Sequence, residues 1–213
     1  MSVGLKKALV AAVAAGTLSL GTIGMAEAAA VQTSRATWEA AAGAFTETTN
    51  FNGDDFTTTS SLSLLGNTAL GFSAPVQKRT VGTSWSSWSG GYTGTVFAYF
   101  GDTLSVNLGA DLTGFGLEIE PNAFGIYVVD VLLDDGTKIS QSIDGMGGAK
   151  FFGWLGDDVL GFTIHAAAGA NGFAFGRFVE GSAKPEPVPE PASLMLFSIA
   201  LLGLGVIYAK RRR

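Results

Sequence analysis

Short runs in which apolar and polar residues alternate fill the middle of this chain and constrain its fold more than any other feature. A period of two is expected of a β-strand that buries one face. Gly, Asn and Asp, which favour turns, separate the runs. The predicted strands are Glu47–Phe51, Ser61–Leu65, Leu70–Ser73, Thr95–Phe100, Thr103–Leu108, Leu112–Glu120, Ile126–Leu133, Lys138–Ile143, Phe151–Leu155, Val159–Ala166 and Phe173–Val179. Many short strands at regular spacing predict an all-β fold, an antiparallel β-sandwich of the jelly-roll type.

Strand parity indicates which residues of the run 112–120 face the core. Phe115, Leu117 and Ile119 share one face and are expected to be buried. Glu118 and Glu120 lie on the other face and are expected to be solvated. They project side by side from one strand, whereas glycoside hydrolysis needs two carboxylates on opposite sides of a bond. This pair therefore does not indicate a glycosidase.

The same rule applies to the run 159–166. It places Leu160, Phe162 and Ile164 inside, and Thr163 and His165 outside. Any Ser–His–acid mechanism would have to use His165, the one histidine of the chain, and the sequence holds no Gly-x-Ser-x-Gly motif. We therefore expect a protein that is not an enzyme.

One short helix is predicted ahead of the strands. Thr33 or Ser34 can cap its first turn, and Gly43 should end it. Its apolar face has helical spacing and consists of Trp38, Ala41, Ala42 and Phe45.

A hairpin is predicted at Asp134-Asp135-Gly136-Thr137, because Gly accepts the positive φ of a tight turn. We expect Val128–Leu133 to pair with Lys138–Ile143.

The first 30 residues have the pattern of a secretory signal peptide. Lys6 and Lys7 precede a small apolar stretch, and Ala26-Glu-Ala28 or Ala28-Ala-Ala30 fits a small-residue cleavage site. The body would then lie outside the cytoplasm as one domain, residues 31–181, followed by a Pro-rich linker at 182–193.

The last residues form a motif, an apolar span and a basic end. Pro189-Glu190-Pro191 comes first, and Leu194–Ala209 carries no charge. As a helix this span would measure roughly 24 Å, near the lower limit for crossing a membrane. The four cations at the end of the chain, which are Lys210, Arg211, Arg212 and Arg213, should stay on the cytoplasmic side. We expect a transmembrane helix with a basic tail over 194–213.

This arrangement resembles the PEP-CTERM sorting tail of Gram-negative bacterial surface proteins. The resemblance implies that exosortase recognises the tail and cleaves near Pro189-Glu190-Pro191 while the precursor is held in the inner membrane. It also implies release to the cell surface or exterior, often in connection with exopolysaccharide. An ordinary single-pass anchor with a Pro-rich stalk is the alternative.

The body is similar to other PEP-CTERM proteins in the helix Ser34–Ala41, followed by Asn50-Phe51, and in the runs Phe151–Trp154 and Gly172–Gly176. That similarity implies a β-sandwich and no known activity.

The exported part is acidic and contains no cysteine. Residues 31–184 hold 7 basic and 15 acidic side chains, a formal charge of −8. Such a body should avoid nucleic acid. The absence of cysteine excludes disulfides, zinc–thiolate sites and cysteine nucleophiles.

The segment Trp85-Ser-Ser-Trp88-Ser-Gly-Gly-Tyr92 combines three large aromatic residues with small polar ones. Exposed aromatic rings can stack on the apolar faces of sugars, so Trp85, Trp88 and Tyr92 are candidate glycan contacts. The alternative is that Trp85 and Trp88 fold back over the edge of the sheet.

Acidic pairs in turns give one further candidate site. Calcium prefers several oxygen ligands, and Asp157 with Asp158, or Asp54 with Asp55, could supply some of them. The sequence shows no spaced Asp-x-Asp-x-Asp-Gly loop, which weighs against calcium. No cofactor other than this possible calcium is predicted. We expect an exported surface or matrix protein with a structural or interaction role linked to exopolysaccharide. The alternative function is a carbohydrate-binding module that uses the aromatic segment.

Overall fold

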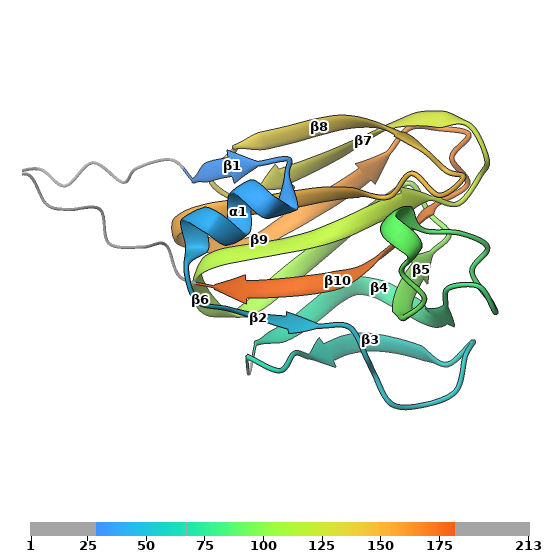
Figure 1. Ribbon diagram of the computed structural model, residues 1–213, viewed down its shortest axis with the longest axis horizontal. Helices are drawn as coiled ribbons and strands as arrows, with labels where there is room; N and C mark the ends of the chain where they lie inside the picture. Colours follow the sequence, from blue (N-terminus) through green and yellow to red (C-terminus); the bar gives the residue numbers. More distant parts are fainter. Residues whose placement is uncertain (1–28, 67, 182–213) are drawn as a thin grey trace, which may run out of the picture.

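The computed structural model describes residues 29–66 and 68–181, without the side chains of residues 110, 111, 157 and 158. Ten strands, one α-helix and one 3₁₀ turn make up this part of the chain (Figure 1). In chain order they are β1 Ala30–Gln32, α1 Arg35–Ala42, β2 Phe45–Thr48, β3 Thr58–Ser63, β4 Ala69–Thr80, η1 Ser89–Gly91, β5 Thr95–Tyr99, β6 Thr103–Pro121, β7 Ile126–Leu133, β8 Lys138–Asp144, β9 Lys150–Ala166 and β10 Phe173–Gly181. The all-β prediction is confirmed.

The strands form one sheet that closes on itself. Its order is β2-β10-β5-β4-β6-β9-β7-β8, and β10 pairs with β5 along one edge and with β6 along the other. All ladders between the described strands are antiparallel. The result is a closed six-strand barrel with extra strands, so the predicted sandwich is not confirmed.

Two long strands account for this difference. The sequence predicts breaks at residues 109–111 and 156–158, but β6 runs through the first and β9 through the second. The β6–β9 register shifts between Asn107 and Leu112 and again before Gly114. Gly and Asp therefore mark bulges here rather than turns. Bulges bend a strand and increase its twist, which helps a sheet to close.

Aromatic and branched side chains fill the interior of the barrel. Phe115, Leu117 and Ile119 of β6 are fully buried there, as predicted. The Phe115 ring lies against Trp154 and Phe162 of β9, with centroid distances of 5.2 and 5.8 Å. This packing should supply most of the stability, because the chain contains no disulfide.

The inward face of β9 differs from the prediction at one position. Phe162 and Ile164 are buried and His165 is exposed, as expected, but Leu160 is 48% exposed. Val159 is fully buried instead. Residues on the same face of a regular strand are an even number of positions apart. Val159 and Phe162 are three positions apart, so the alternation breaks between them, where the β6–β9 register shifts.

The helix and the hairpin are confirmed, except that Phe45, predicted on the apolar face of the helix, begins β2 and is 40% exposed. The Ser34 side chain caps α1 by accepting from Thr37 N, and Gly43 ends the helix with φ +76°. Strands β7 and β8 pair across the Asp135-Gly136 turn, where Gly136 has φ +88°.

The predicted signal peptide lies, apart from Ala29 and Ala30, outside the described residues. The Pro-rich linker from residue 182 and the predicted transmembrane helix with its basic tail also lie outside them. Within 29–66 and 68–181, no helix has both the length and the hydropathy needed to cross a membrane.

Candidate functional site

Two segments cover the outer face of the barrel wall around β6 and β10. The first is α1, whose Trp38 and Ala42 pack against Phe151, Leu155 and Val179. The second is the segment 81–94 between β4 and β5. Its apolar residues form a separate small cluster with the wall, made up of Val81, Trp85, Trp88, Val96, Ala98, Ala149 and Ala174.

Glu118 and Glu120 lie beneath this cover and not in solvent. Their parity is as predicted, opposite to Phe115, Leu117 and Ile119, but they are only 5% and 1% exposed. The prediction of a solvated face is therefore wrong. The reason is tertiary, because parity fixes the face of a strand and does not say whether that face is covered.

Glu118 belongs to a network of buried and half-buried charges. Arg177 Nη1 donates to its Oε1 at 2.7 Å, and Arg35 Nη1 lies 3.8 Å from the same oxygen. Both arginines also contact Glu47, at 2.9 Å for Arg35 and 3.3 Å for Arg177. Burial raises the pKa of Glu118, and hydrogen bonding from Trp88 together with the charge of Arg177 works against that rise. The network joins α1, β2, β6 and β10.

Arg177 reaches this network from an unusual backbone position. Its φ is +51°, in the left-handed region that costs an L-residue roughly 1–2 kcal/mol. The β10–β6 register shifts between Gly176 and Val179, so Arg177 lies in a bulge. The bulge directs the guanidinium toward Glu118, and the contacts it gains there offset the backbone cost.

Trp88 and Tyr92, two of the predicted glycan contacts, make internal bonds. Trp88 is 6% exposed, and its Nε1 donates to Glu118 Oε2 at 2.7 Å. The Tyr92 hydroxyl donates toward the Thr95 and Thr49 carbonyl oxygens, at 2.9 and 3.1 Å. Arg177 lies over the Tyr92 ring, 5.3 Å from its centroid, and burial raises the pKa of the Tyr92 hydroxyl. Both side chains hold the 81–94 segment on the wall.

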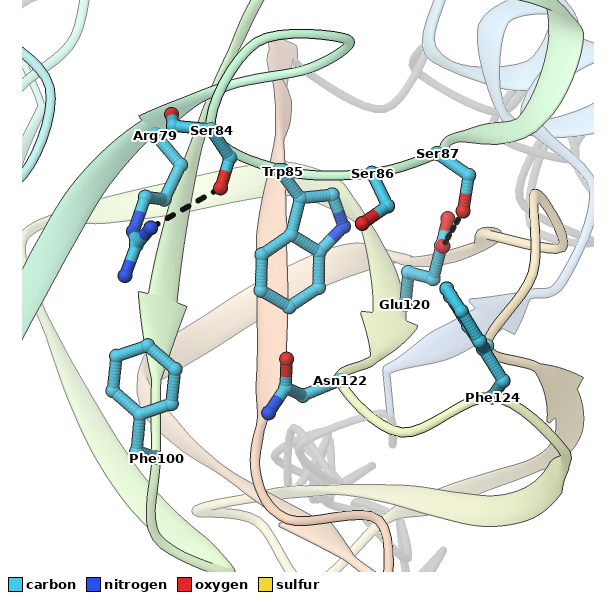
Figure 2. Close-up of a pocket in the computed structure, with 10 residues that line it drawn as sticks. Arg79, Ser84, Trp85, Ser86, Ser87, Phe100, Glu120, Asn122 and Phe124 are labelled. Carbon is cyan, nitrogen blue, oxygen red and sulfur yellow. Dashed lines mark hydrogen bonds between the residues drawn. The ribbon is translucent and has the colours of Figure 1, made fainter.

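Trp85, the third predicted contact, lines a pocket that opens to solvent (Figure 2). The pocket has an empty volume of about 380 Å³, including the part open to solvent. Its lining combines aromatic rings, hydroxyls, an amide and two charged groups, and consists of Arg79, Ser84, Trp85, Ser86, Ser87, Phe100, Glu120, Asn122, Phe124 and Gly145. Phe100 and Phe124 are 55% and 61% exposed, and Trp85 is 7% exposed. The rings available to a ligand are therefore the two phenylalanines and part of Trp85.

Glu120 is a lining residue of this pocket and is almost fully buried. Its Oε1 accepts from Ser87 Oγ at 2.8 Å and from Gly147 N at 3.3 Å. Its Oε2 is buried. Burial raises the pKa of Glu120, although the bonds from Ser87 and Gly147 oppose this. Glu120 therefore fixes Ser87 and the Gly147 backbone at the edge of the pocket.

The residues predicted for calcium fall into two cases. Asp55 accepts from Thr80 Oγ1 at 2.7 Å, from Lys78 Nζ at 3.3 Å and from Ser84 Oγ. Burial alone would raise the pKa of Asp55, but these hydrogen bonds leave it lowered. The side chains of Asp157 and Asp158 lie outside the described part, so calcium there stays a prediction. Among the side chains that the structure describes, no group of three or more acidic or His residues could hold a metal ion.

Comparison with known protein families identifies the C-terminal tail of the chain. Residues 187–213 match the family described as the PEP-CTERM protein-sorting motif. The chain carries a PEP-CTERM motif. This motif is the exosortase recognition signal and includes the predicted Pro189, Glu190 and Pro191. It implies an exported protein with a membrane-anchored precursor that exosortase processes. No curated protein matches the chain.

Sequence reasoning found Trp85 but missed most of the pocket and the charge network. The charge network could have been suspected from Arg177, which is the one cation in the apolar run Phe173–Val179. A lone charge among strand residues of that kind suggests a buried partner. Phe100, Asn122 and Phe124 carry no such signal, because they meet only when the ends of β5 and β6 come together.

Proposed function

We propose that this protein is an exported, non-enzymatic component of the cell surface or exopolysaccharide matrix of a Gram-negative bacterium, and that it binds polysaccharide through the pocket around Trp85. The observation that supports this proposal most strongly is the composition of that pocket. Phe100 and Phe124 offer exposed rings, while Asn122 and Ser86 offer polar contacts. Ligand sites commonly combine apolar surfaces with a few such polar groups.

The position of the pocket supports this role. Phe173, at the start of β10, pairs with Tyr99 and Pro121, next to the pocket residues Phe100 and Asn122. Strand β10 ends at Gly181, eight residues later and roughly 26 Å away. The described chain ends there, at the end of the barrel opposite the start of β10 (Figure 1). A body held through its tail would therefore present the pocket away from the attachment point.

The charges favour a neutral, hydroxyl-rich ligand. The exported part carries a formal charge of −8, and Glu120 lies in the pocket. The net charge of the exported part disfavours anionic sugars, while the two charged lining residues, Arg79 and Glu120, have opposite signs, so the pocket itself favours neither charge. Among the lining residues Glu120 is the one carboxylate, and glycoside hydrolysis normally uses two. These features support binding rather than hydrolysis.

The test is binding of the exported, processed protein to neutral polysaccharide fractions, measured by affinity electrophoresis. Phe100→Ala and Phe124→Ala should each weaken binding about tenfold, which corresponds to about 1.4 kcal/mol. Phe45→Ala is the matched control, since Phe45 is also partly exposed, at 40%, and packs beside α1. Unchanged binding in both pocket variants would remove the pocket from the proposal. Absence of binding to every fraction would leave a structural role without glycan recognition.

A further inference from the structure

Ala29 belongs to the folded barrel. Its side chain is 7% exposed and is part of the barrel core. The next residue, Ala30, opens strand β1 and pairs with Leu155 of β9. The backbone of Ala29 also lies close to Gly156, where an added Cβ would come within 3.2 Å of Ala29 Cα. Ala29 and Ala30 are therefore both part of the packed barrel.

The backbone nitrogen of Ala29 lies beside a surface carboxylate. It donates to Asp135 Oδ2 at 3.3 Å. Asp135 is exposed in the β7–β8 turn, where it also accepts from Thr137 N at 2.7 Å and Thr137 Oγ1 at 3.0 Å. Burial alone would raise the pKa of Asp135, but the bonds from Thr137 and Ala29 leave it lowered. A negative charge is thus held next to the Ala29 nitrogen.

The two signal-peptidase patterns differ in what they leave of this arrangement. Cleavage after Ala30 would remove the Ala29 side chain from the core and the first residue pair from the β1–β9 ladder. Cleavage after Ala28, at the Ala26-Glu-Ala28 pattern, would leave both intact. The Ala26-Glu-Ala28 pattern is therefore the one that keeps every described contact of Ala29 and Ala30.

We propose that a signal peptidase hydrolyses the Ala28–Ala29 bond and that the new α-ammonium group of Ala29 pairs with Asp135. Water adds across the peptide bond, so that Ala28 leaves with a carboxylate and the Ala29 nitrogen becomes protonated at neutral pH. A neutral amide donor to Asp135 is thereby replaced by an ammonium group in the same place. Processing would convert a plain hydrogen bond into a charge-assisted one that closes the end of the barrel.

The cleavage site is tested by export of the full chain in a Gram-negative host, followed by intact-mass analysis and N-terminal sequencing. The expected product begins Ala29-Ala-Val-Gln. Ala26→Leu should slow processing at least tenfold, because position −3 of the site requires a small residue. Ala30→Leu is the matched control, since Ala30 is exposed and lies after the cut. A product that begins at Val31 or Met1, or a block by Ala30→Leu in place of Ala26→Leu, overturns the proposal.

The ion pair is tested on the processed protein by NMR titration of the α-amino group. A carboxylate about 3 Å away at the surface should raise the pKa of that group by about one unit from its usual 7.7–8.0. Asp135→Asn should abolish the rise. Asp134→Asn is the control, because Asp134 accepts from Leu160 N and belongs to the same exposed turn. Equal titration midpoints in wild type and Asp135→Asn would refute the ion pair.

Discussion

The two faces of β6 bury side chains of opposite character. Toward the barrel interior, Phe115, Leu117 and Ile119 are apolar and fully buried. Toward the outside, Glu118 and Glu120 are equally buried but charged, and they are held by Trp88, Ser87 and the arginines. The interior depends on packing, and the outer layer depends on hydrogen bonds and ion pairs. Burial alone does not distinguish the two, but their responses to mutation should.

The largest effect is expected from a cavity in the interior. Phe115→Ala should destabilise the protein by about 3–5 kcal/mol, because it removes a ring that packs against Trp154 and Phe162. Chemical denaturation monitored by fluorescence measures this loss. Phe45→Ala, at a partly exposed ring outside the barrel, serves as the control and should cost much less. A cost below about 1 kcal/mol for Phe115→Ala would contradict the role given to the barrel core.

The outer charge network should give the next largest effect. Arg177→Met keeps most of the side-chain volume but leaves Glu118 and Glu47 without this partner. Removing one member of a buried pair costs up to about 3–5 kcal/mol, and we expect about 2–3 here, because the Arg177 side chain is 24% exposed.

A double-mutant cycle separates the charge from the shape. Adding Glu118→Gln to Arg177→Met should recover part of the loss, with a coupling of about 1–2 kcal/mol. Strictly additive losses would mean that the two side chains act independently.

These two regions also show what the sequence could predict. The interior face of β6, the hairpin and α1 follow from alternation, an Asp-Gly turn and a helix cap, all of which are local. Leu160 was misplaced because the β6–β9 register shifts between Val159 and Gly161 and breaks the alternation there, and nothing in the sequence at residues 156–161 distinguishes an irregular continuous strand from a turn. The closed barrel was missed for the same reason, since the breaks predicted in β6 and β9 produced short strands suited to a sandwich.

The candidate site was predictable in part. The aromatic segment was found because its composition is unusual, but the roles of its residues depend on what lies beneath it. Trp88 bonds Glu118, 30 residues away in sequence, and Ser87 bonds Glu120, 33 residues away. Such partners come from the ring closure of the sheet, which alternation does not encode.

A smaller effect is expected from the indole bond that links segment and wall. Trp88→Phe keeps a ring in place and removes the N–H that donates to Glu118 at 2.7 Å. Hydrogen bonds to charged groups contribute about 1.5–3 kcal/mol, so we expect a loss of about 2 kcal/mol in the free energy of unfolding. The control is Trp85→Phe, at a similarly buried residue of the same segment, because it removes no bond to Glu118. Equal costs in the two variants would show that packing, and not this hydrogen bond, decides.

The smallest effect concerns pH, and it distinguishes the two faces of β6 most directly. Burial raises the pKa of Glu118 and of Glu120, so each binds its proton more tightly when folded than when unfolded. Stability from these groups is then present below the unfolded pKa, roughly 4.3, and falls as pH rises toward the raised folded pKa.

Glu120→Gln removes one ionisable group and should flatten this fall, so that the variant gains stability relative to wild type at pH 7 and loses the gain below about pH 4. The control Asp102→Asn, at an exposed carboxylate, should not reproduce that pattern. Phe115→Leu, on the other face, should shift stability by the same amount at both pH values. Thermal melts of all four proteins at pH 4 and pH 7 make the comparison, and a Glu120→Gln difference that is independent of pH would contradict the burial of an ionisable carboxylate on the outer face.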